Sequence, residues 1–584
     1  MQLVNRLHFR NLRGDLFGGL TAAIVALPLA LAFGVSSGAG AITGLYGAIF
    51  VGFFAALFGG TPSQISGPTG PMTVVMTSVF TALITKNPET GLAMGFTVVM
   101  LGGLFQILFG VLRLGKYITL MPYTVISGFM SGIGVIIIII EIAPLLGHQT
   151  YGSVVESLRE LPGFVMDPKP AATALGLLTL AIVFGSPPKL NRILPAPLLA
   201  LVVCTLISVY LLPGSEIMRI GEIPIGLPKI HLPVFNFAQI KDIVGYGLML
   251  ATLGAIDSLL TSLVADNITR TQHDSDRELI GQGIGNLISG LFGGLPGAGA
   301  TMRTVINVYA GGKTSLSGII HALVLLIIVL WAGGLTENIP HTVLAGILIK
   351  VGIDIIDWSF LKRAHRISFK ATGLMYAVLL LTVFVDLITA VAVGVFIANL
   401  LTVKRLSEIQ SDKIKVITTP SDEMSLSHEE KLLLKQAGGQ IILFRLGGPM
   451  SFGAAKTISQ RMSIVENYDV LILDFSDVPM LGITTSLAIE NMVKDACEKR
   501  RQVFLVGASG KVKARLRRLK VLNLLPPKNR VSTRLYALKK AMALIQGYGA
   551  QENGATLNEN SLETDNSATN DTEADTNETI LRDR

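Results

Sequence analysis

The chain has 584 residues, of which 50% are hydrophobic and only 15% charged, and it contains 61 glycines. This composition excludes a disordered chain and an ordinary water-soluble enzyme, and it is typical of a helical protein that crosses a membrane several times. The formal net charge of +8 comes largely from basic loops between apolar runs, so we assign it to membrane topology and expect no nucleic-acid partner. The two cysteines and scattered histidines show no ligand spacing, so we expect no metal centre, cofactor or enzymatic chemistry.

A series of apolar runs approaches the length needed to cross about 30 Å of hydrocarbon. They lie at 15–34, 43–60, 93–112, 121–147, 171–187, 195–213, 244–266, 277–294, 315–333 and 371–403. Shorter apolar pieces at 69–84, 301–310 and 341–356 are too short or too broken for ordinary spans. The Lys and Arg residues of the loops fall on the same predicted side of the membrane as the N-terminal leader 1–14. The positive-inside rule therefore places both termini in the cytoplasm. The transmembrane domain, at 15–405, is expected in the cell (inner) membrane. Glu141 is predicted to lie near the outer mouth.

Two segments of the chain repeat each other. Residues 47–62 read GAIFVGFFAALFGGTP and residues 281–296 read GQGIGNLISGLFGGLP. Each is followed by small residues and then by a short apolar piece. A Gly/Pro-interrupted hydrophobic segment at the same place in both halves of a membrane protein indicates a transporter binding site.

The character of the chain changes after Arg405. Strand-length apolar runs now alternate with helix-like segments, which predicts a soluble α/β domain of roughly four strands at 406–548. The predicted strands begin at 441, 470 and 503, and the predicted helices cover 452–465, 484–500, 510–518 and 532–546. Residues 549–584 are rich in Asn, Thr, Glu and Asp, so we expect a disordered acidic tail.

Three motifs resemble one known family. They are GDLFGGLTAAIVALP from Gly14, MPYTVISGFMSGIG from Met121 and DFSDVPMLGITTS from Asp474. In this order they are similar to the SulP anion transporters, which carry a cytoplasmic STAS domain. The segments LGKY at 114–117, IDIIDW at 353–358 and FLKRAH at 360–365 resemble the cyanobacterial bicarbonate-transporting branch of that family.

The resemblance implies a membrane domain of fourteen segments, built as a seven-plus-seven inverted repeat and divided into core and gate domains. It also implies two half-helices that start near Thr69 and Thr301 and point their N-termini at the anion. Unpaired N–H groups and the helix dipole make such ends suitable for an anion. The implied anion-binding residues are Thr69, Gly70, Ala300, Thr301 and Arg303.

The apolar segment 248–264 holds one carboxylate, Asp257, and Thr261 follows one helical turn later on the same face. An ionisable residue inside a membrane span is a functional candidate. The resemblance implies a coupling-cation site, for sodium, made by Asp257, Thr261, Gly299 and Thr301. Two alternatives remain open from the residues alone: Asp257 pairs with Arg303, or it caps a break in the helix.

The chain departs from the bicarbonate branch at two positions. That branch resembles an Ile-Ser-Glu-Pro-Thr-Gly pattern where this chain has Gly67, and it has Gly where this chain has Arg303. Both departures make the site more positive. They argue against sodium dependence and bicarbonate selectivity and support the alternatives of sulfate, another oxyanion or proton coupling, while the resemblance as a whole keeps sodium-coupled bicarbonate transport first.

The STAS-like segment resembles bacterial anti-sigma-factor antagonists, in which a Ser or Thr after an Asp is phosphorylated. Here Gly482 replaces the Asp and Thr484 keeps the hydroxyl, so Thr484 is a weak regulatory candidate, and the domain is expected to form a homodimer. The sequence thus predicts a secondary active transporter of a small inorganic anion, with bicarbonate uptake by sodium symport favoured. Sulfate or other oxyanion transport, by proton coupling or exchange, is the alternative, and a regulatory STAS scaffold is a weaker one.

Overall fold

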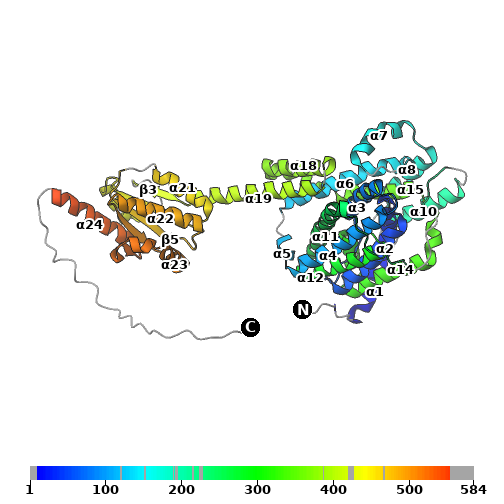
Figure 1. The fold of residues 1–584 in the computed structure, drawn as a ribbon, viewed down its shortest axis with the longest axis horizontal. Coiled ribbons are helices and arrows are strands. Elements are labelled where there is room, and N and C mark those ends of the chain that lie inside the picture. Colours follow the sequence, from blue (N-terminus) through cyan, green and yellow to red (C-terminus); the bar gives the residue numbers. More distant parts are fainter. Residues whose placement is uncertain are drawn as a thin grey trace. The chain divides into compact units, whose positions relative to one another are not determined.

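The computed structural model describes residue 5 and residues 9–118, 122–149, 153–187, 190, 195–212, 216–221, 228–385, 387–418, 426–463 and 467–552. The chain divides into two compact units, Met1–Ala398 and Asn399–Arg584 (Figure 1). Most of the predicted leader before Phe9, and the predicted acidic tail after Glu552, lie outside the described residues.

The described residues contain seven principal helices in each half of the membrane domain, two of which, α3 and α13, are half-helices. The first seven are α1 (Leu12–Ser36), α2 (Ala41–Phe58), α3 (Gly70–Lys86), α4 (Gly91–Val111), α6 (Tyr123–Leu145), α8 (Pro170–Gly185) and α10 (Ala196–Tyr210). The second seven are α11 (Ile240–Thr269), α12 (Ser275–Leu291), α13 (Thr301–Tyr309), α14 (Ser315–Thr336), α15 (His341–Ile355), α18 (Phe369–Phe384) and α19 (Leu387–Asp412). Short helices connect them: η1 (Phe9–Asn11), α5 (Gly115–Ile118), α7 (Val154–Met166), η2 (Phe237–Gln239), α16 (Trp358–Leu361) and α17 (Ala364–Ile367).

Length and composition alone identify fewer membrane spans than this. Within the described residues, six helices are long and apolar enough to cross a membrane, or seven if α7 and α8, which meet at 110°, form one span. The half-helices α3 and α13 are too short for that test, with 17 and 9 residues. The apolar run 371–403 forms two helices, α18 and α19.

Packing sorts these helices into two groups. In what we call the core group, α12 packs on α2 and α4, α11 packs on α4 and α13, and α1 packs on α14. In what we call the gate group, α6 packs on α15 and α18, and α8 packs on α10 and α15. The structure therefore has the core and gate division that the resemblance implied.

The two half-helices are joined at their starts. β1 (Ser66–Gly67) pairs antiparallel with β2 (Ala298–Gly299), with Ser66 opposite Gly299 and Gly67 opposite Ala298. α3 follows β1 and α13 follows β2, so the repeated segments meet at equivalent places in the two halves. Extended backbone inside a membrane domain is tolerated only where protein or a wet cavity satisfies it. Here the two strands satisfy each other.

The second unit contains a five-stranded sheet in the order β3 (Lys415–Ile417), β4 (Ile441–Gly447), β5 (Val470–Asp477), β6 (Gln502–Val506) and β7 (Arg530–Val531). β3 runs antiparallel to β4 and the other neighbours are parallel. The prediction of roughly four strands missed one, because β3 and β7 are only three and two residues long.

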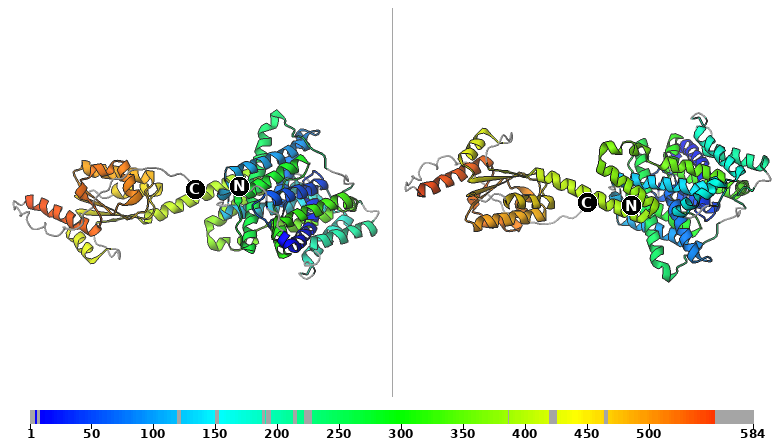
Figure 2. Two further views of the ribbon diagram at one scale, coloured as in Figure 1. Left: turned by 90° about the horizontal axis from the view of Figure 1, so that it is seen from below. Right: turned by 90° about the horizontal axis from the view of Figure 1, so that it is seen from above.

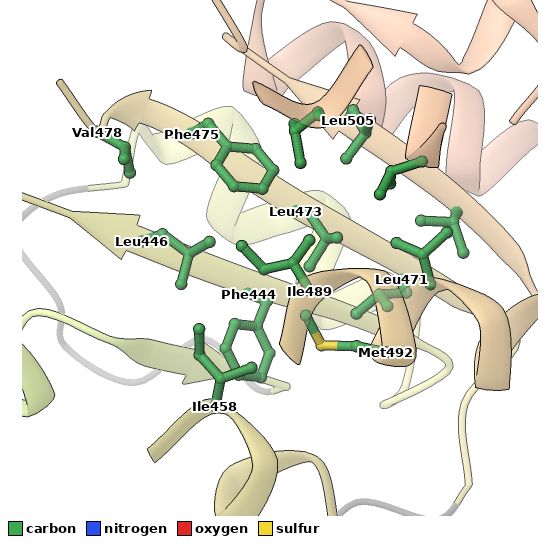
Figure 3. Close-up of a cluster of buried hydrophobic side chains, with 14 of the residues drawn as sticks. Phe444, Leu446, Ile458, Leu471, Leu473, Phe475, Val478, Ile489, Met492 and Leu505 are labelled. Atoms are coloured by element: carbon green, nitrogen blue, oxygen red, sulfur yellow. The ribbon is translucent and has the colours of Figure 1, made fainter. Parts of the chain in front are cut away.

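Alternating side chains of the sheet enter two separate cores. Phe444, Leu471 and Leu473 face α21 (Phe452–Ser463), α22 (Ile483–Glu498) and α23 (Gly510–Arg518), as Figure 3 shows for this cluster. Leu443 and Ile472 face α20 (His428–Gln436) and α24 (Arg534–Glu552). Figure 2 shows the sheet between these two helical layers. The alternation of side chains between the two cores is the period-two pattern expected of strands that are covered on both faces. Short helices η3 (Val521–Leu524) and η4 (Pro527–Asn529) precede β7.

Candidate anion and cation site

The half-helices begin where the sequence predicted. Thr69 is the N-cap of α3 and Gly70 its first residue, while Ala300 is the N-cap of α13 and Thr301 its first residue. Both caps are extended, and neither cap side chain bonds to its first turn in the part of the chain that the structure describes. The N–H groups of these first turns are therefore directed at the space between the helix starts, which suits an anion.

Asp257 contacts the start of α3 directly. Its side chain is buried, and its Oδ2 accepts a hydrogen bond of 2.8 Å from Oγ1 of Thr69. It lies in the middle of α11, which argues against a role as a helix cap. Asp257 and Arg303 interact electrostatically, so their pairing remains an open alternative. Two hydrogen bonds join the predicted anion residues to the predicted cation residues, one from Thr69 to Asp257 and one between Thr261 and Thr301.

Thr261 connects α11 to the start of α13. Its Oγ1 donates to the carbonyl oxygen of Gly299 at 2.9 Å and lies 2.7 Å from Oγ1 of Thr301. Since the single hydroxyl proton of Thr261 is used on Gly299, Thr301 is the donor in the second bond. Two hydroxyls and one carbonyl therefore lie within hydrogen-bonding reach of one another, and the carboxylate of Asp257 lies one helical turn before Thr261 on the same helix. Oxygen ligands of this kind suit a hard cation.

Arg303 is buried against the junction of β1 and α3. Its Nη2 donates to the carbonyl oxygen of Pro68, and only 3% of its surface is exposed. Gly67 leaves the room for it, because a Cβ atom there would lie 2.8 Å from Nη1 of Arg303. The guanidinium therefore adds a fixed positive charge next to the N-terminus of α3, within the predicted anion site.

One buried carboxylate was missed from the sequence. Glu278, in the first turn of α12, accepts hydrogen bonds of 2.9 Å from the N–H groups of Gly60 and Thr61 and of 2.8 Å from Gln64 and Gln282. It thereby fixes the loop between α2 and β1. In the sequence, the acidic residues around Glu278 resemble the ordinary first turn of a helix, so Glu278 was not singled out. The available signal was that Glu278 and Gln282 lie one turn apart on the same helix face.

Ser258 was also missed. Its Oγ accepts a hydrogen bond of 3.1 Å from the N–H of Gly299, so Ser258 and Thr261 of α11 hold the two backbone polar groups of this residue of β2. In the second unit, Thr484 lies exposed in the first turn of α22, away from these residues in the sequence.

The family model described as "Sulfate permease family" matches residues 12–378, and the model described as "STAS domain" matches residues 433–534. The chain belongs to the sulfate permease family. The predicted resemblance to SulP transporters with a STAS domain is thus confirmed, and the chain is a multi-pass membrane transporter of anions, not an enzyme.

Two relatives match this chain over nearly its whole length. "Bicarbonate transporter BicA" of Synechocystis sp. is 53% identical over 94% of this chain and 98% of its own length. "Bicarbonate transporter BicA" of Picosynechococcus sp. is 54% identical over 93% and 97%. A solved structure, "The transmembrane domain of a cyanobacterium bicarbonate transporter BicA", matches with a TM-score of 0.64 and 58% identity over 67% of this chain and 100% of that one.

Proposed function

We propose that this transporter takes up bicarbonate by sodium symport across the cell inner membrane, with both termini in the cytoplasm. The proposal draws on the 53% and 54% identity to two proteins named as bicarbonate transporters. The observation that carries the coupling is the hydrogen bond from Thr69 to Asp257, which joins the anion end of α3 to the one carboxylate of the cation cluster.

The contact suggests how a cation would favour the anion. A carboxylate beside the anion site repels the anion, because like charges close together in a low dielectric interact strongly. Sodium held by Asp257, Thr261, Thr301 and the carbonyl of Gly299 would neutralise that charge. The first-turn amides of α3 and α13, with Thr69, Gly70 and Ala300, would then bind bicarbonate between the two helix starts.

A second candidate is sodium-independent transport of sulfate or another oxyanion, by proton coupling or exchange. Arg303 favours it, because its buried guanidinium already supplies a positive charge beside the N-terminus of α3. A divalent oxyanion would gain more from a fixed charge than bicarbonate would.

The deciding experiment is uptake of labelled bicarbonate and labelled sulfate by cells that express the chain, with sodium present or replaced by choline. Sodium-dependent bicarbonate uptake that is lost in Asp257→Asn supports symport. Asp242→Asn is the matched control, because Asp242 is an exposed carboxylate in the first turn of the same helix and pairs with Lys86. Sulfate uptake that is unchanged in choline would replace symport by the second candidate.

We also propose that the STAS domain forms the homodimer. Met480, Ile483 and Leu487 expose apolar side chains where β5 leads into α22, and Thr484 lies among them. Apolar side chains gathered in this way are typical of an interaction surface. Light scattering of the purified chain should give twice the protomer mass, and Ile483→Asp should give the protomer mass. Retention of the dimer in Ile483→Asp would exclude this surface, and a monomeric parent chain would exclude the dimer. Absence of bicarbonate and sulfate uptake by the folded full-length chain would favour the regulatory STAS-scaffold alternative.

A further inference from the structure

A cavity lies between the core and gate groups, and none of the predicted anion or cation residues lines it. It has a volume of about 250 Å³ and is lined from the core side by Ala32, Val35 and Ser36 of α1. From the gate side it is lined by Glu141 of α6 and by His341 and Leu344 of α15. α1 ends at Ser36, so we call the membrane face at this end of α1 the far face.

One hydrogen bond closes the core side of this cavity against the gate side. Oγ of Ser36, the last residue of α1, donates to Oε1 of Glu141 at 2.6 Å. The carboxylate is only 3% exposed, although it lies close to the end of α6. A buried carboxylate without a role in binding the anion is costly in a membrane domain, so its position requires an explanation.

The half-helix that carries the anion site leads to the same place. Threonines recur at every fourth residue of α3, and each hydroxyl from Thr73 onward donates to the carbonyl one turn earlier. Thr69, Thr73 and Thr77 are buried, whereas Thr81 and Thr85 are exposed. Oγ1 of Thr77 also bonds to the carbonyl of Ser36 at 3.1 Å. A polar face of α3 therefore runs from the anion site, past Ser36, to the exposed end of the helix.

We propose that the cavity at the far face is the access vestibule of the anion path, and that the hydrogen bond between Ser36 and Glu141 holds this path closed in the present conformation. Any motion of the core group against the gate group that opens the far face must separate these two residues. The threonine face of α3 would then line the opened path down to Thr69. This role is independent of which anion or coupling ion is used, and it goes beyond the proposed function.

The test measures access to the path rather than transport. Cys204 and Cys497 are replaced by serine, and Thr73→Cys is introduced as a reporter that is 3% exposed in the closed conformation. A membrane-impermeant thiol reagent is applied to right-side-out and to inside-out vesicles, and the rate of modification is measured at one fixed pH. The fixed pH is needed because His148 and His341 also line the cavity.

Ser36→Ala and Glu141→Ala should each raise the modification rate from the far face by about fivefold or more, as expected for the loss of a hydrogen bond to a charged group. Glu141→Gln keeps an acceptor for the hydroxyl of Ser36. In this variant the reporter cysteine at residue 73 should therefore be modified at nearly the parent rate. Ser78→Ala is the matched control, because that hydroxyl bonds only within α3.

The proposal is overturned if Ser36→Ala leaves the far-face rate unchanged or lowers it, or if Ser78→Ala raises the rate equally. Ser36→Ala alone decides the question if Glu141→Ala does not fold, because it removes one small hydroxyl and leaves the carboxylate in place. A rise seen only from the opposite face would also exclude the proposed vestibule.

Discussion

A Cβ atom on Gly67 would lie 2.8 Å from Nη1 of Arg303 and 3.2 Å from Cα of Ala48, and the φ of +153° at Gly67 is one that other residues rarely adopt. A side chain at residue 67 would therefore strain the backbone and force the guanidinium to shift. The two positions at which the sequence departs from the pattern of the bicarbonate-transporting branch thus lie against each other, one on β1 and the other on α13.

The first prediction concerns this pair. Gly67→Ala should lower the melting temperature of the purified transporter, because overpacking a filled site costs about 1–3 kcal/mol. Adding Arg303→Gly should restore only part of the loss, because it removes the guanidinium but not the strain of a φ of +153° or the approach to Cα of Ala48 at 3.2 Å. Melting curves of the two single variants and the double variant give the coupling between them. Additive effects of the two changes would contradict the close approach.

A second prediction concerns the hydroxyl of Thr69, which donates to Asp257. Thr69→Val leaves the buried carboxylate without this donor, and a hydrogen bond to a charged group contributes about 1.5–3 kcal/mol. We expect anion uptake to fall by about tenfold or more, with a raised KM for the coupling ion. Thr69→Ser keeps the hydroxyl and should retain most of the uptake. Equal activity of the valine and serine variants would show that the bond to Asp257 has no role in transport.

The sequence was most informative about breaks in helices, because these depend on the conformation of a few neighbouring residues. Gly and Pro around Thr69 and Thr301 interrupt two apolar runs, and the observed half-helices start at Gly70 and Thr301. Glycine and proline set the conformation of a few neighbouring residues, so such breaks can be read without tertiary information.

Contacts between distant segments could not be predicted in the same way. Thr69 and Asp257 lie 188 residues apart, and nothing in either segment shows that they share a hydrogen bond. Glu141 was predicted only to lie near the outer mouth, because its partner Ser36 lies 105 residues away. The pairing of β1 with β2 was missed for the same reason, and two-residue strands carry no periodicity.

A third prediction concerns three charged side chains in the STAS domain. Arg534 of α24 bonds Glu430 of α20 at 2.8 Å and Asp474 of β5 at 3.1 Å, and both carboxylates are buried. Arg534→Met leaves two buried acids without their cation, and breaking such a group costs about 3–5 kcal/mol. Urea unfolding of a fragment covering 406–548 at neutral pH measures the loss. A change below the error of the measurement would contradict a stabilising role for Arg534.

The same group predicts a dependence on pH. Burial by itself raises the pKa of Glu430, but hydrogen bonds from Arg534 and Ser427 outweigh it and hold the pKa below its ordinary value of 4.5. Because the pKa is lowered on folding, the stabilisation is fully present above pH 4.5 and is lost as the pH falls through the lower, folded value. The gap in unfolding free energy between the parent fragment and Glu430→Gln should therefore narrow in acid. A gap that is constant down to the acid transition would contradict this.

A fourth prediction concerns the crossing of α4 and α12, where two glycines face each other. A Cβ atom on Gly103 would lie 2.4 Å from the backbone nitrogen of Leu287, and one on Gly283 would lie 2.5 Å from the carbonyl oxygen of Gly103. Small residues allow membrane helices to approach this closely. Gly103→Ala must move backbone rather than a side chain, so we expect a lower yield and a melting temperature reduced by several degrees.

Gly373 of α18 is the matched control, because a Cβ atom there would meet nothing within 4 Å. Alanine favours a helix over glycine by about 1 kcal/mol, so Gly373→Ala should leave the melting temperature unchanged or raise it. The same chemical change should thus have opposite effects at two helical sites of one protein. Helix propensity would predict a gain at both, and only the close approach of α4 to α12 explains a loss at Gly103. Equal gains at both positions would therefore show that these helices are not held by the contact between Gly103 and Gly283.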